Sequence, residues 1–148
     1  MTFWNKLRAK VGLGSTGEYE SDELLLYMDN DQKLYRQMQA IRLNLIKHFC
    51  RGNFNSTQAE KGFAHATDEA NRQYKKEFSY QGFPPVERAK VNKELVKRLK
   101  RDVNYCLEGF QCNDLTKDEE SLLKSKKCKV STPMAGLRGT KKTKGKRR

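Results

Sequence analysis

The sequence predicts an all-α protein: a three-helix bundle with short terminal helices and a basic, disordered C-terminal tail. Three observations lead to this prediction. Apolar residues recur at helical spacing in three long stretches, polar or glycine-containing turns separate those stretches, and the last 25 residues lose the period while gathering positive charge. We expect long helices at about 30–50, 56–78 and 86–110.

These elements define three parts of the chain. Residues 1–14 are predicted to hold an amphipathic strap helix, 22–123 the helical bundle domain, and 124–148 a lysine-rich tail. A chain of 148 residues has room for one domain and a tail, and no run approaches the roughly 20 apolar residues of a membrane span.

The N-terminal stretch 2–11 places apolar side chains four residues apart, with lysine and arginine on the other side. The helix either packs on the body as a strap or docks on a membrane surface or a protein partner. Ten residues make a marginal helix in isolation, which argues against a membrane anchor that works alone. A protein partner would contact Phe3, Trp4 and Leu7.

Ser21 precedes two acidic residues and is a plausible start for the next helix, which carries the apolar run 24–28. Asp29, Asn30 and Asp31 then cap or break this helix. We favour a short helix that joins or kinks into the first long one, with a strand as the lesser alternative. The three polar residues lack the glycine and distal glutamate of a calcium loop, so capping is the preferred interpretation.

The first long helix is the strongest signal in the chain. Its apolar residues recur at spacings of four, three, four and four and form one stripe: Leu34, Met38, Ile41, Leu45 and Phe49. Three residues flank the stripe: Tyr35, Arg42 and Ile46. Gly52 is well placed to close it in the left-handed conformation. Asn55 or Ser56 can cap the second helix, whose stripe consists of Ala59, Phe63, Ala66, Ala70 and Tyr74.

The third long helix follows Pro85 and separates apolar from basic residues. One face carries Val91, Leu95, Leu99, Val103, Cys106 and Phe110. The opposite side carries Lys90, Lys93, Lys97, Arg98, Lys100 and Arg101, with Glu94 as the only acid among them. This side is either an ordinary solvated face or a phosphate-binding surface. The predicted core combines the three stripes through Leu34, Met38, Ile41, Leu45, Phe63, Tyr74, Leu95, Leu99 and Val103.

Thr116 and Glu119 fit a capping box for a short last helix. The charge of the chain is unevenly placed beyond it. Residues 1–123 carry 20 Lys and Arg and 18 Asp and Glu, whereas 124–148 carry 11 Lys and Arg and no acid. Such a segment attracts a polyanion. The tail cations predicted to bind are Lys124, Lys126, Lys127, Lys129, Lys141, Lys142, Lys144, Lys146, Arg147 and Arg148.

The cysteines and histidines predict no catalytic or metal site. The four cysteines form no CxxC pair, and no secretory leader is visible, so we expect no disulfide scaffold, no metal and a cytoplasmic protein, nuclear if the host is eukaryotic. His48 and Cys50 resemble a thiol–base pair but point apart on a helix. We therefore expect no enzyme and no cofactor.

The order of signals resembles a class of small helical proteins of bacterial and phage genomes that has no assigned activity. The motifs are Asp31 with Leu34-Tyr35-Arg36, the turn 52–55, Ala66 and Ala70 with 74–78, and Arg88, Val91 and Leu95, within roughly 24–101. The resemblance implies an all-α body in a bacterial or phage setting and no chemistry.

The functional hypothesis is a small nucleic-acid-associated protein, for RNA or DNA, that uses a basic helix face and the tail. Its binding would be electrostatic and independent of sequence. The alternative is a protein-binding adaptor or inhibitor encoded by a phage or bacterium.

Overall fold

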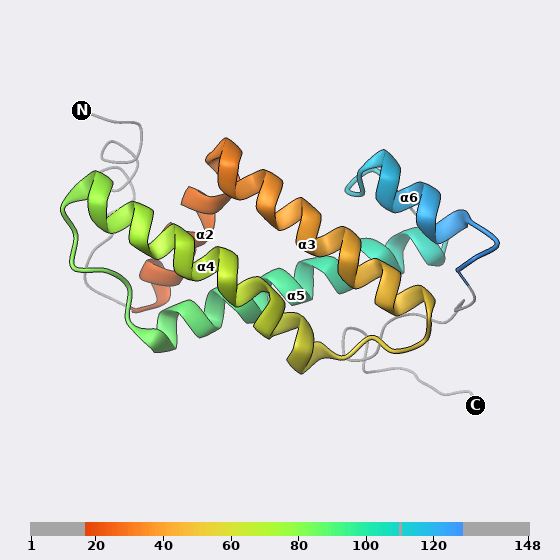
Figure 1. Cartoon of the computed structure of the whole chain (residues 1–148), viewed down its shortest axis with the longest axis horizontal. Coiled ribbons are helices and arrows are strands. Elements are labelled where there is room, and N and C mark those ends of the chain that lie inside the picture. The colour runs from red at the N-terminus through yellow and green to blue at the C-terminus, as the bar shows by residue number, and fades with distance from the viewer. Residues whose placement is uncertain (1–16, 110, 129–148) are drawn as a thin grey trace.

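The computed structural model describes residues 17–109 and 111–128, and these residues are all-helical (Figure 1). In chain order the helices are α2 (Gly17–Asn30), α3 (Gln32–Cys50), α4 (Ser56–Phe78), α5 (Pro85–Leu107) and α6 (Lys117–Lys124). The predicted strap helix, with Phe3, Trp4 and Leu7, lies outside the described residues.

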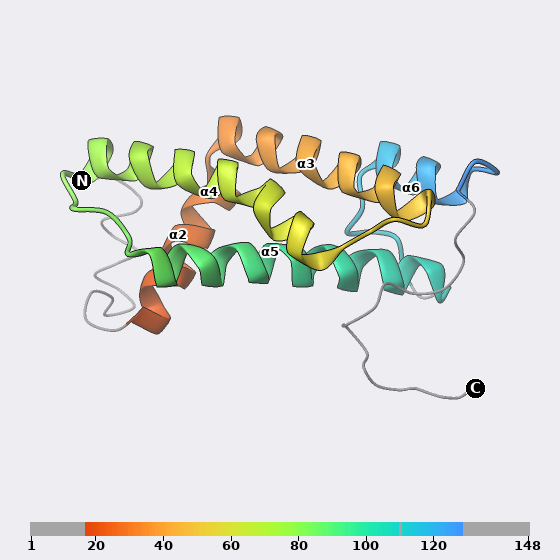
Figure 2. The same ribbon diagram turned by 60° about the horizontal axis from the view of Figure 1, so that its bottom comes forward.

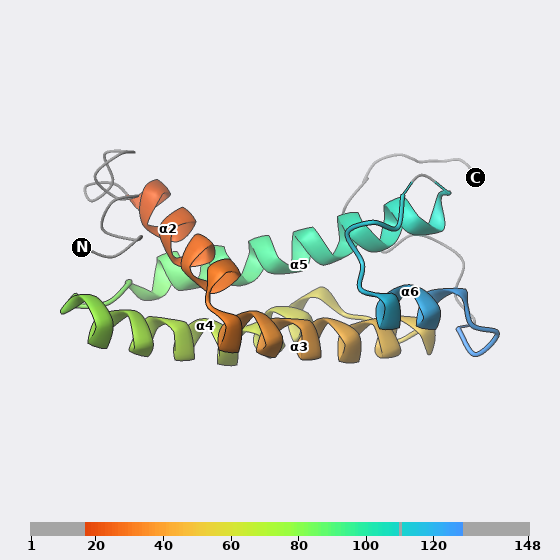
Figure 3. The ribbon, with the colours of Figure 1, turned by 90° about the horizontal axis from the view of Figure 1, so that it is seen from above.

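The long helices form two layers. Helices α3 and α4 run antiparallel in one layer, and α5 forms the other layer behind them (Figures 1 and 3). Helix α2 crosses from the α5 side to the start of α3, and the turned view shows it beneath α3 and α4 (Figure 2). Helix α6 lies beside the C-terminal half of α3, at the same end of the molecule as the C-terminus of α5 (Figure 3).

Local capping chemistry confirms the helix boundaries. The amide of Leu34 donates to Asp31 Oδ2 at 3.0 Å, so Asp31 caps α3 immediately after α2 ends. The Gln58 amide donates to Asn55 Oδ1 at 3.0 Å at the start of α4. Both halves of the predicted capping box between Thr116 and Glu119 are present in α6. Helix α5 ends at Leu107, three residues before its predicted end.

Helix α2 begins at Gly17, four residues before the predicted start at Ser21, and is a larger part of the core than the short helix that the sequence predicts there. It spans 14 residues and packs against α3, α4 and α5. Leu24, Tyr27 and Met28 are almost completely buried. The Tyr27 hydroxyl donates to Glu77 Oε1 at 2.8 Å and accepts from Gln73 Nε2 at 3.0 Å, which ties α2 to the end of α4.

The core follows the three predicted stripes, with one difference. Leu34, Met38, Leu45, Phe63, Tyr74, Leu95, Leu99 and Val103 are buried, as predicted, whereas Ile41 is only partly buried. Ile46, which the sequence places at the edge of its stripe, is fully buried instead. An aromatic cluster closes the end where α4 turns into α5, with Tyr74 in edge contact with Tyr27, Tyr80 and Phe83.

All four cysteines are disulfide-bonded, so the prediction of a chain without a disulfide scaffold is wrong. Cys50 at the end of α3 is bonded to Cys128, and Cys106 in α5 to Cys112. The first pair lies 78 residues apart in the sequence and the second only six, so neither has the spacing of a CxxC motif. The folding of α6 along α3 brings Cys50 and Cys128 together.

The two disulfides differ in the length of chain that they constrain, and this predicts unequal effects on stability. Closing the long loop raises the free energy of the unfolded chain by about 4 kcal/mol, and closing the short loop raises it by about 2 kcal/mol. The pair C50A/C128A should therefore lower the free energy of unfolding more than the matched pair C106A/C112A. Urea denaturation of both variants measures this difference, and an equal or reversed ranking would contradict it.

Candidate nucleic-acid interface

One exposed row of cations follows the solvent side of α5. We define the α5 basic stripe as Lys90, Lys93, Lys97 and Arg101, all of which are exposed. Lys97 lies two residues after the buried Leu95 and two residues before the buried Leu99, and Lys93 and Arg101 are flanked in the same way. Residues two apart on a helix point about 200° apart, so these three side chains point away from the core. The stripe rises over about 17 Å of helix, which matches roughly five steps of a nucleic-acid duplex at 3.4 Å per step.

Acidic partners touch only the ends of the stripe. Lys90 Nζ lies 3.4 Å from Glu87 Oε2, and Arg101 Nε lies 3.3 Å from Asp102 Oδ1. Lys93 and Lys97 in the middle form no ion pair with the described residues. The centre of the stripe therefore presents two uncompensated charges to solvent.

Two of the six cations predicted on this face lie elsewhere. Arg98 points toward α2, and its Nη1 lies 3.1 and 3.0 Å from the two carboxylate oxygens of Asp29. Lys100 is 91% buried, and burial lowers its pKa while the charge of Glu60 on α4 opposes that change. The predicted face was too wide because a helix carries two adjacent cations such as Lys97 and Arg98 in directions about 100° apart.

The predicted tail begins with residues that belong to the folded body. Lys124 is the last residue of α6, and its Nζ lies 2.6 Å from Glu120 Oε2. Lys126 and Lys127 are exposed in the turn that follows, and Cys128 is bonded to α3. The remaining predicted tail contacts lie outside the described residues: Lys129, Lys141, Lys142, Lys144, Lys146, Arg147 and Arg148.

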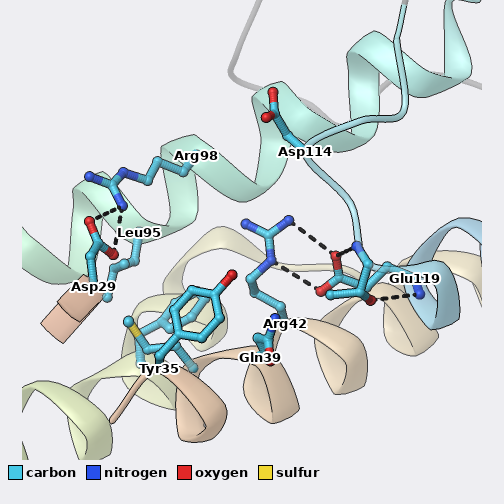
Figure 4. Close-up of a pocket in the computed structure, with 11 residues that line it drawn as sticks. Asp29, Tyr35, Gln39, Arg42, Leu95, Arg98, Asp114 and Glu119 are labelled. Atoms are coloured by element: carbon cyan, nitrogen blue, oxygen red, sulfur yellow. Dashed lines mark hydrogen bonds and ion pairs between the residues drawn. The ribbon is translucent and has the colours of Figure 1, made fainter. Parts of the chain in front are cut away.

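A small pocket of about 100 Å³ lies between α3, α5 and the segment that leads into α6 (Figure 4). Arg42 rises from α3 beside it, and its Nε and Nη2 donate to the two carboxylate oxygens of Glu119 at 3.1 and 3.3 Å. Its Nη1 donates to Asp102 Oδ2 at 3.1 Å. The ion pair of Arg98 with Asp29 forms another wall, and Tyr35 lies between the two groups.

Burial dominates the electrostatics of this network. The side chains of Glu119 and Asp102 are only 1% and 5% exposed, and that of Arg42 is 16% exposed. Burial raises the pKa of the Asp102 carboxyl more than Arg42 and Arg101 lower it. Burial by itself would lower the pKa of Arg42, but its bonds to Glu119 and the charge of Asp102 raise it. Because all three of its nitrogens already donate to carboxylates, we assign Arg42 a structural role.

Sequence reasoning placed Arg42 only at the flank of the α3 stripe and did not detect this network. Glu119 was identified as a capping residue, and its Oε1 does accept from the Thr116 amide at 3.0 Å. The same carboxylate therefore caps α6 and anchors it to α3 through Arg42. An arginine beside an apolar stripe was the one available signal, and it does not specify partners 60 and 77 residues away.

The described residues contain no arrangement of the kinds considered for catalysis. Cys50 is buried in its disulfide and cannot act as a thiol beside His48. Throughout 17–109 and 111–128, no three His, Cys, Asp or Glu side chains gather in a way that could hold a metal ion. None of the helices in that part of the chain has the length and apolar character needed to cross a bilayer.

Comparison with known proteins returns no match to any family model, curated protein or solved structure. The functional inference below therefore rests on the geometry and charge of this chain.

The Arg42 network predicts a stability effect that depends on pH. Replacing Arg42 by alanine leaves Asp102 and Glu119 buried without their main partner, and should lower the free energy of unfolding by about 3 kcal/mol at pH 7. R72A, which breaks an exposed pair with Glu69, is the matched control and should change it by less than about 1 kcal/mol.

The deficit of R42A should shrink as the pH falls from 7 toward 4. Burial raises the pKa of Asp102 in the folded protein and Arg42 opposes that rise, so the loss of Arg42 raises this pKa further. As the pH falls toward the ordinary carboxyl value near 4, proton uptake therefore stabilises folded R42A more than the folded parent. Denaturation of R42A and the parent at pH 7 and pH 5 measures the change. A deficit that stays constant or grows at pH 5 would show that no buried carboxylate is left uncompensated.

Proposed function

We propose that this chain is a small, non-catalytic nucleic-acid-associated protein that binds RNA or DNA phosphates without sequence selectivity. The α5 basic stripe is the contact on the folded body, and the cationic C-terminal segment extends it. In this proposal no cofactor or metal takes part. The proposed setting is a larger assembly in a bacterial or phage-infected cell, with the strap residues free to contact a protein partner.

The observation that carries the proposal is the uncompensated charge of Lys93 and Lys97. A solvated helix face usually mixes signs. Exposed cations elsewhere on the described part of the body include paired ones, such as Arg72 with Glu69, and unpaired ones, such as Lys47, so the stripe is set apart by the alignment of its cations along one helix face.

Within the stripe, the buried carboxylates of Glu87 and Asp102 contact only the terminal cations, Lys90 and Arg101. Glu94, the acid between Lys93 and Lys97, forms no ion pair with the described residues. A row of ammonium groups 5–6 Å apart at their bases suits a polyphosphate backbone.

The C-terminal segment adds further positive charge at one end of this row. Residues 129–148 carry eight of the 31 Lys and Arg residues and no acid. The bond from Cys128 to Cys50 fixes Cys128, the residue before this segment, at the end of α3, on the side of the molecule where α5 also ends (Figure 3). Contacts to phosphates can therefore continue from Arg101 into this segment.

Neutralising the centre of the stripe should weaken binding and flatten its salt dependence. Each phosphate contact contributes roughly 0.9 to the slope of log affinity against log salt, so K93Q/K97Q should lower the magnitude of that slope by about 1 to 2. K47Q/K117Q removes the same charge from exposed positions outside the stripe and is the control. Fluorescence anisotropy with duplex DNA, duplex RNA and single strands at four salt concentrations measures both slopes.

The proposal predicts similar affinities for different sequences of one length, because phosphates carry no sequence information. Equal slopes for K93Q/K97Q and K47Q/K117Q would remove the α5 basic stripe from the mechanism. Absence of measurable binding by the parent protein at about 50 mM salt would overturn the function as a whole.

A second function, a protein-binding adaptor or inhibitor, is favoured by one observation. All four cysteines are paired, and structural disulfides are typical of secreted or periplasmic proteins rather than cytosolic ones. A protein partner captured by the oxidised chain, and retained after nuclease treatment and a wash at about 0.5 M salt, would support this function because surface charges are then largely screened. Loss of all captured material under that wash would favour nucleic acid.

A further inference from the structure

A second basic surface lies on α4, on the side of the body away from the α5 basic stripe. A shallow groove of about 600 Å³ is lined by residues of α4 and the turn after it, with one residue from the start of α3. We define the α4 basic surface as its four cations: Lys33, Arg72, Lys75 and Lys76. Glu69 is the only acid that lines the groove.

The direction of this surface follows from the burial of α4. Arg72 lies two residues from both Ala70 and Tyr74, which are fully buried, and so projects about 200° from the core. Lys76 stands in the same relation to Tyr74 and Phe78. Helix α4 packs against α5, α3 and α2, and α5 lies in the other layer (Figure 3). Cations opposite the buried stripe of α4 therefore face away from the interface with α5, as the α5 basic stripe faces away from α4.

The acid in the groove leaves an excess of positive charge. Glu69 Oε2 lies 3.5 Å from Lys33 Nζ, and Glu69 Oε1 lies 2.5 Å from Arg72 Nη2. One carboxylate thus serves two cations, whose side chains remain 71% and 66% exposed. Lys75 and Lys76 are exposed and form no ion pair with the described residues. The groove therefore holds four positive charges against one negative charge.

Helix capping electrostatics explain only part of this cluster. Lys75 and Lys76 lie in the last turn of α4, where the helix dipole favours cations. Arg72 precedes that turn, and Lys33 comes from the opposite end of a different helix. The dipole of α4 therefore does not explain why Arg72 and Lys33 line the same groove as the two terminal lysines.

We propose that the α4 basic surface binds the phosphate backbone of a second nucleic-acid segment, so that one molecule bridges two duplexes. This inference rests on the proposed function, because the first segment occupies the α5 basic stripe. Two packed helices with their side chains are about 20 Å thick, so duplexes on the two faces are held apart without a steric clash. The bridge is electrostatic, independent of sequence and sensitive to salt.

A two-duplex capture experiment tests the bridge with the intact, oxidised chain. One biotinylated 40-base-pair DNA duplex is fixed on beads, a second fluorescent duplex without biotin is added, and the fluorescence retained at about 50 mM salt is measured with and without protein. The same measurement with RNA duplexes distinguishes the source of the phosphates. Binding of a single duplex is measured in parallel by anisotropy.

The variants separate the two surfaces. K75Q/K76Q should retain the parent's affinity for a single duplex within about threefold, but it should lower the captured fluorescence at least fivefold. The control K47Q/K117Q removes the same charge and should lower the captured fluorescence by less than twofold. Thermal melts of all variants, within a few degrees of the parent, show that they are folded. If stability falls in K75Q/K76Q, the double variant R72Q/K76Q replaces it.

Each outcome decides one claim. Single-duplex binding by the parent without capture of the second duplex overturns the bridge and leaves the proposed function intact. Equal capture by K75Q/K76Q and K47Q/K117Q also overturns it, because the second contact then lies outside the α4 basic surface. Absence of single-duplex binding by the parent overturns the proposed function itself.

Discussion

The packing of α4 against α5 is the interaction on which the rest of the structure depends. Ala66 and Ala70 on α4 are fully buried small residues that permit close helix approach, and α4 and α5 share the most extensive contact among the described helices. Because each helix has a single apolar stripe, this contact leaves the charged side of each helix facing outward. The positions of both basic surfaces are therefore consequences of core packing. A charged residue that falls between the two sides, such as Lys100, is drawn into the interior and needs an acid such as Glu60 nearby.

Charges inside the body and charges on its surface have different roles. Arg42, Asp102 and Glu119 are removed from water, so each one depends on the others, and together they hold α6 to α3 and α5. Lys93 and Lys97 remain hydrated and exert their field outward, where salt screens it within about 10 Å at 0.1 M. A partner that displaces this hydration must bring its own negative charge. This contrast supports assigning the inner cluster to architecture and the outer rows to binding.

The sequence analysis succeeded where the determinants are local. Asp31, Asn55 and the pair Thr116–Glu119 cap helices within three residues of themselves, so their parts could be predicted from spacing alone. It failed where partners are distant in the chain. The depth of α2 in the core, the pairing of Arg98 with Asp29 and the bond between Cys50 and Cys128 all depend on how the helices pack. All four cations of the α5 basic stripe were among those that the sequence predicts on this face of the helix. The structure was needed to show that Arg98 and Lys100 lie outside it.

The bond between Cys50 and Cys128 determines where the C-terminal segment originates. Residues 129–148 follow it, and 20 residues of fully extended chain span at most about 70 Å. Under the proposed function, a phosphate strand on the α5 basic stripe would share that volume with the eight cations of this segment. One molecule in such a volume corresponds to a local concentration on the order of 1 mM, so weak individual contacts would combine into a higher avidity. The covalent anchor would make the contact between these phosphates and the cations of residues 129–148 an intramolecular step within the complex.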